Sequence, residues 1–222
     1  MKANFLHSRT AVRATAAYLA AMTALALPTL AYAESATVTG AGALSTNARL
    51  DFRITIPKVL FLRVGTGGLF GAAPNTTVDL IDFIVPAANL GDGVAIAATA
   101  LSGNLGNGAV TALLRSNAGV VTLTANTLGA ISNGAGDTIP WSEIAIASSA
   151  LVTPAFANTL PHPLALPLTG ASTPFAPAPI ARITNVGSTW TFSYRNTATV
   201  PAGVYGGVAL NQGRVTYTAS VL

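Results

Sequence analysis

Apolar and polar residues alternate along much of this chain, and this alternation constrains the fold more than any other feature of the sequence. In residues 189–195, Trp190, Phe192 and Tyr194 are separated by single polar residues. Successive side chains of a β-strand point to opposite faces, so a segment of this kind buries one face of a sheet. No segment after residue 34 sustains the i, i+3, i+4, i+7 pattern of an amphipathic helix. The sequence therefore predicts an all-β protein.

The alternating segments are separated by turns rich in Asn and Gly, which tolerate the positive φ angles of tight hairpins. Short strands at this spacing are typical of antiparallel sandwiches. We expect one Ig-like β-sandwich domain with Greek-key or jelly-roll-like connections. The expected strands are residues 51–64 (broken at Pro57), 77–85, 94–101, 109–115, 120–125, 189–195 and 214–221.

A long connection punctuated by seven prolines occupies residues 151–179. It also carries apolar residues such as Phe156, Leu160 and Phe175, which a free linker would not need. We therefore expect it to lie across the domain, as a crossing between two sheets.

The first 33 residues have the features of a secretory signal peptide. Lys2, Arg9 and Arg13 precede an apolar run over residues 14–27, and the tripeptide Ala-Tyr-Ala ends at Ala33. The apolar run is shorter than the about 20 residues that span a bilayer, and the chain has no Cys that could be acylated. We expect cleavage after Ala33 and export to the periplasm, the cell surface or the extracellular space of a bacterium, with no membrane span in the mature chain.

The mature chain, residues 34–222, is weakly charged. Eight basic residues against seven acidic ones leave a net charge of +1, because three of the eleven basic residues lie in the leader. This balance offers no basic patch for nucleic acid. The absence of Cys means that the fold is held by burial and β-ladder hydrogen bonds, without disulfides, in an oxidising compartment.

Few residues could support catalysis or bind a metal. His162 is the only histidine after the leader, and it lies in a Pro-His-Pro sequence that predicts a rigid loop. There is no Cys nucleophile and no G-x-S-x-G motif, and a single His without any Cys argues against a zinc site. Asp92 and Asp137 fit turns, and residues 89–93 lack the EF-hand calcium pattern. We expect no catalytic residue, no cofactor and no metal site, and hence no enzyme.

The two tryptophans receive different predictions. Trp190 shares a strand face with Phe192 and Tyr194, which favours the core. Trp141 follows Ile-Pro and is the candidate for stacking against a ligand such as a sugar ring.

The C-terminal strands resemble those of secreted bacterial surface β-sandwiches of the pilin-like or WxL-like type. The resemblance rests on residues 190–194, 201–207 and 213–219, which read WTFSY, PAGVYGG and GRVTYTA. It covers roughly the last 35 residues together with the signal peptide. It implies an Ig-like sandwich with a role in surface structure or attachment and no catalysis. The chain departs from chaperone-assembled pilins because it has no Cys pair.

The N-terminal part of the mature chain, residues 34–48, contains a second feature that fits assembly. Residues 35–44 (SATVTGAGAL) form a strand-competent segment that can pair with the open sheet edge of a neighbouring copy. The alternative is that this segment is the first strand of its own domain. The residues expected to take part in assembly are Val38, Gly40, Gly42 and Leu44 of this segment and Val215, Tyr217 and Ala219 of the last strand.

Two functions therefore follow as hypotheses. The first is a secreted, non-enzymatic structural or adhesive surface protein, such as a pilus or filament subunit that assembles by β-strand addition with copies of itself or with other surface components. The second is a monomeric module that binds a carbohydrate or another ligand, which predicts a solvent-accessible Trp141.

Overall fold

The computed structural model describes residues 35–152, 156, 158–162, 165–207 and 211–221. The expected signal peptide and its cleavage site lie outside this range. The chain divides into two units. The first ends at Thr55, and the second begins at Ile56. In the first unit, residues 35–55 form no helix or strand, and every one of them is exposed.

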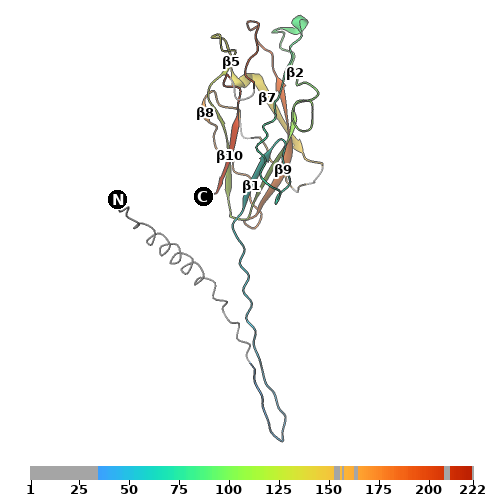
Figure 1. Cartoon of the computed structure of the whole chain (residues 1–222), viewed down its shortest axis with the longest axis vertical. Coiled ribbons are helices and arrows are strands. Elements are labelled where there is room, and N and C mark those ends of the chain that lie inside the picture. Colours follow the sequence, from blue (N-terminus) through green and yellow to red (C-terminus); the bar gives the residue numbers. More distant parts are fainter. Residues whose placement is uncertain (1–34, 153–155, 157, 163–164, 208–210, 222) are drawn as a thin grey trace, which may run out of the picture. The chain divides into compact units, whose positions relative to one another are not determined.

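The second unit, Ile56–Leu222, contains a sheet built around two long neighbouring strands. The two are β3 (Ala109–Ser116) and β9 (Thr184–Tyr194), of which β9 is labelled in Figure 1, and they pair from Ala109↔Thr191 to Ser116↔Thr184. The other strands of this sheet are β1 (Leu60–Val64) beside β3, and β2 (Ile96–Ala97) and β7 (Ile144–Ala150) beside β9. All pairings are antiparallel.

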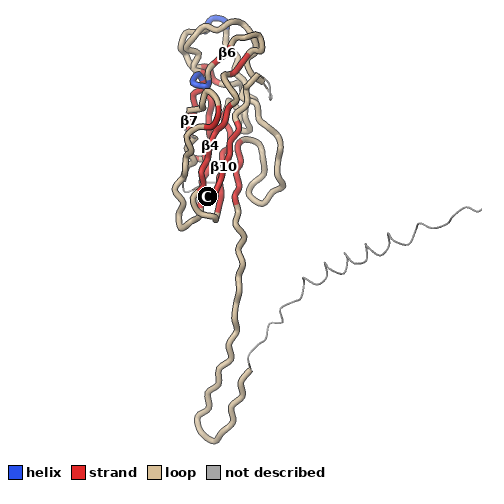
Figure 2. Tube along the Cα trace, turned by 90° about the vertical axis from the view of Figure 1, so that its left-hand side faces the viewer, coloured by secondary structure: helices blue, strands red, loops and turns tan. Residues whose placement is uncertain are grey.

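A second sheet has the order β10-β4-β8. Figure 2 shows β4 and β10 side by side, as their pairing requires. A short hairpin of β5 and β6 and two single-turn 3₁₀ helices complete the described elements. Their bounds are β4 (Val121–Thr127), β8 (Gly170–Ala171), β10 (Thr216–Val221), β5 (Ile131–Ser132), β6 (Thr138–Ile139), η2 (Ala87–Asn89) and η3 (Trp141–Glu143). The all-β antiparallel class predicted from the sequence is thus confirmed.

Both sheets contribute to one hydrophobic core. Leu114 and Trp190 come from the first sheet and Val121 and Leu123 from the second, and all four are fully buried. The indole N–H of Trp190 donates a hydrogen bond of 2.8 Å to the carbonyl of Leu160, so its only polar atom is satisfied inside the core. This placement of Trp190 agrees with the sequence, and the arrangement is sandwich-like. The Ig-like connectivity stays a prediction.

Strand alternation matches burial most closely in the second sheet. In β4, every second residue is buried and the residues between them are half-buried. In β10, Tyr217, Ala219 and Val221 pack against the core, whereas Thr216 and Thr218 are exposed. The face predicted for the last strand is therefore correct.

Of the strand predicted over residues 51–64 and broken at Pro57, only the part after the proline forms a strand, β1, and the prediction for residues 51–56 is wrong. The amide of Asn117 donates to the carbonyl of Pro57, and its oxygen accepts from the N–H of Val59, both at 2.8 Å. These bonds replace ladder bonds where β3 ends, and Pro57 has no N–H to continue the ladder. Residues 50–58 are exposed.

Two further predicted strands are absent or short. Residues 77–85 are extended but belong to no strand, although Ile81 and Phe83 pack against the core. Within residues 94–101 only β2 pairs. Residues 35–44 are likewise not a strand of the described structure. The pattern of alternation is real in these segments, but alternation alone does not provide a partner strand.

The described parts of the proline-rich connection, residues 151–179, contact both sheets as expected. Asn158 forms a bridge with Val186 of β9, and Phe175 forms one with Leu123 of β4. Residues 153–155, 157 and 163–164 of the connection lie outside the described part of the chain. In the described ranges, no helix is long and apolar enough to cross a membrane.

Candidate assembly edge and apolar pocket

Two strands with an unpaired edge lie next to each other at one side of the second unit. Among the described residues, β1 pairs only with β3, and β10 pairs only with β4, yet β1 and β10 are neighbours (Figure 1). We call these adjoining edges the seam. Each edge leaves a row of backbone N–H and C=O groups without a strand partner. The seam is therefore chemically suited to accept an additional strand.

The seam is lined by apolar side chains that are only partly buried. Leu62 and Val64 of β1 and Tyr217, Ala219 and Val221 of β10 all pack against the core without being enclosed by it. A further apolar segment placed here would cover them and remove more apolar surface from water.

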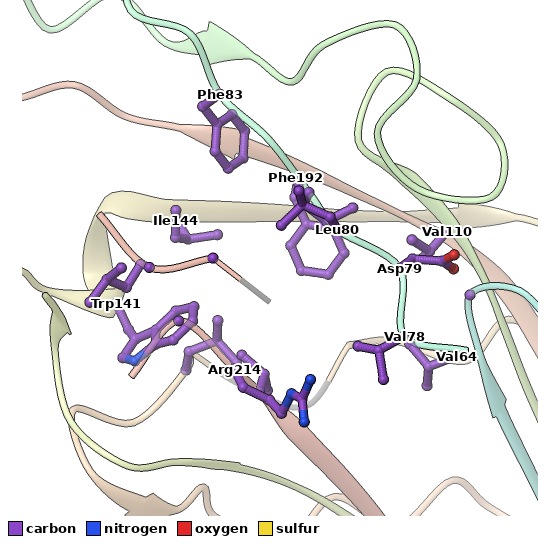
Figure 3. Close-up of a pocket in the computed structure, with 18 of the residues that line it drawn as sticks. Val64, Val78, Asp79, Leu80, Phe83, Val110, Trp141, Ile144, Phe192 and Arg214 are labelled. Carbon is purple, nitrogen blue, oxygen red and sulfur yellow. The ribbon is translucent and has the colours of Figure 1, made fainter. Parts of the chain in front are cut away.

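An apolar pocket of about 300 Å³ lies where β1 ends and β10 begins. Val64 and Tyr217 line it together with Trp141, Ile144 and Phe192, and Figure 3 shows the last three converging on the same space. Among the described residues that line it, only Asp79 and Arg214 are charged. Such a lining binds apolar groups and offers few polar contacts that would orient a polar ligand.

The Asp79 carboxylate holds one wall of the pocket in place. It accepts hydrogen bonds from the backbone N–H of Thr66 at 2.5 Å and from the Thr66 hydroxyl at 2.6 Å. Gly65, with a φ of 83°, makes this approach possible, because a Cβ at that position would collide with the carboxylate. Asp79 thus fastens residues 77–83 to the end of β1, which is a structural use of the carboxylate.

Trp141 lines the pocket but is not the exposed platform that a ligand-stacking role predicts. Its side chain is 6% exposed, and its indole N–H donates to the carbonyl of Gly129 at 2.7 Å. The ring packs in a small second core cluster with Ala125 and Leu166. The expectation of a solvent-accessible Trp141 is therefore wrong: the short 3₁₀ helix η3 turns the ring inward.

His162 lies among aromatic rings on the inner side of the last strand. Its Nε2 is 2.7 Å from the hydroxyl of Tyr217, and its ring meets those of Trp190, Phe192 and Tyr217 edge to face, with centroids 4.7, 6.0 and 5.4 Å away. Burial raises the pKa of the Tyr217 phenol, because a phenolate would be poorly solvated there. These contacts give His162 a packing role.

The remaining polar clusters in the described ranges stabilise loops. Asp92 accepts hydrogen bonds from Asn89, Val94 and the buried Asn196; the Asn89 amide and the Val94 N–H contribute most to lowering the pKa of the Asp92 carboxyl. Asp137 accepts from Asn133, as its predicted turn requires. No group of three or more His, Asp or Glu residues in these ranges is placed to hold a metal ion.

The residues predicted to assemble are found in two different situations. Val215, Tyr217 and Ala219 share the inner face of the C-terminal segment, beside the free edge of β10. Val38, Gly40, Gly42 and Leu44 are all exposed in the first unit. The sequence analysis missed that residues 50–56 are exposed as well. Pro57 was the available signal, since it marks where the ladder stops.

No protein-family model, no curated protein and no solved structure matches this chain. The function is therefore argued from the edge, the pocket and the exposed N-terminal segment.

Proposed function

We propose that this chain is an exported, non-enzymatic structural or adhesive protein of the bacterial cell surface, whose copies assemble by β-strand addition into a filament. The leader-like residues 1–33 support export, and the C-terminal strands support the resemblance to pilin-like and WxL-like surface proteins. The low charge of the mature chain is compatible with close packing of like copies, since little repulsion opposes it.

The observation that carries this proposal is that β10 and the adjoining β1 each have one edge without a strand partner among the described residues. Natural β proteins usually protect such edges with charges, prolines or a covering segment, because open edges pair with other chains. The residues of β10 are Thr, Tyr, Thr, Ala, Ser and Val, without a single charge or proline. An edge of this composition favours addition of a strand from another copy.

Size-exclusion chromatography with light scattering on residues 34–222 tests assembly directly. The proposal expects multimers whose mass grows with protein concentration, and electron microscopy should then show linear polymers. A monomer of constant mass at every concentration would rule out the filament.

Export is tested separately by expressing the full chain in a bacterial host. Mass spectrometry of the exported protein should find Glu34 as the first residue. An Ala33→Leu variant, which removes the small residue at the cleavage site, should retain the leader. A cytoplasmic, uncleaved wild-type chain would contradict export.

A second candidate function, a monomeric ligand-binding module, is favoured by the apolar pocket of about 300 Å³. The burial of Trp141 argues against sugar stacking, and the lining favours a small apolar ligand instead. If this function is correct, a monomer should bind one molecule of anilinonaphthalene sulfonate saturably, with the apolar rings of the dye in the pocket. The dye should bind more weakly to a Val215→Trp variant, whose larger side chain would fill the pocket.

A further inference from the structure

We propose that the strand donated between copies is residues 50–56, and that it adds to the free edge of β10 in a second copy with its apolar side chains directed into the seam and the pocket. This inference rests on the proposed function and names the donor and the acceptor. It replaces residues 35–44 as the donor.

Residues 50–56 have the pattern of a strand that buries one face. Leu50, Phe52, Ile54 and Ile56 alternate with Asp51, Arg53 and Thr55. In the structure these four apolar side chains are between 62% and 85% exposed. Four large apolar residues in a row on one strand face are an unusual surface to leave in water, and they mark an interaction site.

Residues 35–44 are a poorer donor for a physical reason. Two of the four positions on their alternating face are Gly40 and Gly42, which have no side chain to fill a groove. The other two, Val38 and Leu44, are 45% and 53% exposed, less than any apolar residue of the 50–56 segment. Glycine also has the largest backbone entropy to lose when a strand forms.

The donor segment has no strand to pair with in the described part of its own copy. The ladder between β1 and β3 ends at Leu60↔Ser116, and the next residue, Asn117, binds the backbone at Pro57 and Val59. Residues 50–56 therefore form no ladder within the described part of their own copy, and their strand-like pattern is available to a second copy.

The acceptor matches the donor in length and in side-chain character. Seven residues of extended chain cover about 23 Å, and β10 has six residues of the same rise. The seam presents Leu62, Ala219 and Val221, and it ends in the pocket beside Val64 and Tyr217. The pocket offers an apolar anchor point for one large donor residue such as Phe52, while the charged donor residues Asp51 and Arg53 face solvent.

A pair of matched double substitutions separates the two donor candidates. Phe52→Asp with Ile54→Asp places two charges on the proposed donor face, and Val38→Asp with Leu44→Asp does the same to residues 35–44. All four positions are exposed, so neither variant should disturb the fold of the subunit, which circular dichroism checks.

Light scattering on residues 34–222 then gives distinct outcomes. The inference expects multimers in the wild type and in the Val38/Leu44 variant, and monomers in the Phe52/Ile54 variant. Loss of assembly in the Val38/Leu44 variant alone would overturn the donor while leaving strand addition standing. A monomeric wild type would overturn strand addition itself, and the donor with it.

The acceptor is tested by disulfide cross-linking, for which a chain without Cys is a clean background. A Thr55→Cys chain is mixed with a chain of different mass that carries Cys at Thr216, Thr218 or Ser220, the outward positions of β10. Neighbouring strands bring Cα atoms to about 4.5–5.5 Å, within disulfide reach.

Oxidation should give a mixed dimer with at least one of the three β10 partners. A Thr39→Cys chain, the control, should give none. Assembly that depends on Phe52 and Ile54 but cross-links to none of the three positions would overturn β10 as the acceptor.

Discussion

The imidazole Nε2 of His162 lies 2.7 Å from the hydroxyl of Tyr217, inside the ring cluster that also contains Trp190. This contact joins the long proline-rich connection to the last strand. The inner face of β10 is therefore fixed by packing, whereas its outer edge has no strand partner among the described residues. Because packing already orders the backbone of β10, this strand loses little backbone entropy when a partner strand binds to its open edge.

A double-mutant cycle between His162 and Tyr217 measures this contact. His162→Phe and Tyr217→Phe keep an aromatic ring at each position and remove the two atoms that make this contact. We expect each variant to lose about 1–3 kcal/mol of unfolding free energy, because a buried polar group is left without its partner. The double variant should lose less than the sum, with a coupling energy of about 1 kcal/mol. Urea unfolding at neutral pH measures all four proteins, and strictly additive losses would contradict the contact.

Alkaline pH should destabilise the protein through Tyr217. Burial raises the pKa of its phenol above the unfolded value of about 10, so the folded state keeps the proton longer than the unfolded state does. The stabilisation is complete below pH 10 and is lost as the pH rises toward the folded pKa, by up to about 1.4 kcal/mol per pH unit. Urea unfolding between pH 9 and 11 should show this slope.

The matched control for that slope is Tyr194. Burial, with a smaller effect of the Glu143 carboxylate, also raises the pKa of its phenol. Tyr217→Phe should make the unfolding free energy fall less steeply between pH 9 and 11. Tyr194→Phe should keep the part of this pH dependence that comes from Tyr217. An unchanged slope in Tyr217→Phe would mean that Tyr217 is not the titrating group.

Gly65→Ala should loosen the pocket wall. The new Cβ would be strained at a φ of 83° and would collide with the Asp79 carboxylate, which must then release Thr66. We expect a loss of about 1–3 kcal/mol, the usual cost of a strained backbone position. In a domain of this size, each kcal/mol corresponds to about 2–4 °C in melting temperature. Gly42→Ala is the control, because no atom lies within 4 Å of its Cβ, and it should melt like the wild type.

How far the sequence predicts the structure depends on whether a feature is set by a segment's own residues or by distant ones. Alternation predicts the buried face of β4 and nearly the bounds of β3 and β4, but not their partners β9 and β10, which lie far away in the sequence. Residues 50–56 alternate just as regularly, but the end of the ladder depends on the Asn117 side chain, which lies about 60 residues away in sequence. The packing of His162 among aromatic rings could not be predicted from the sequence either, because its contact with Tyr217 joins residues 55 positions apart.

The orientation of Trp141 could not be predicted from the sequence either. Its neighbours Pro140 and Ser142 suggest a strand start, and only the 3₁₀ helix and the Gly129 carbonyl direct the ring inward. The same burial argues against a sugar-stacking role for Trp141, since a stacking platform must be open to solvent.

Tryptophan fluorescence tests this point, because the chain has only two tryptophans. In a Trp190→Phe variant, all emission comes from Trp141. With the ring 6% exposed and packed beside Leu166, we expect blue-shifted emission and weak quenching by acrylamide, several-fold below that of a free indole. Trp141→Phe gives the matching signal of Trp190, which is fully buried and should be quenched no more strongly. Strong quenching of Trp141 in a folded Trp190→Phe variant would show that the ring is open to solvent. The monomeric binding module would then be the better explanation of the pocket.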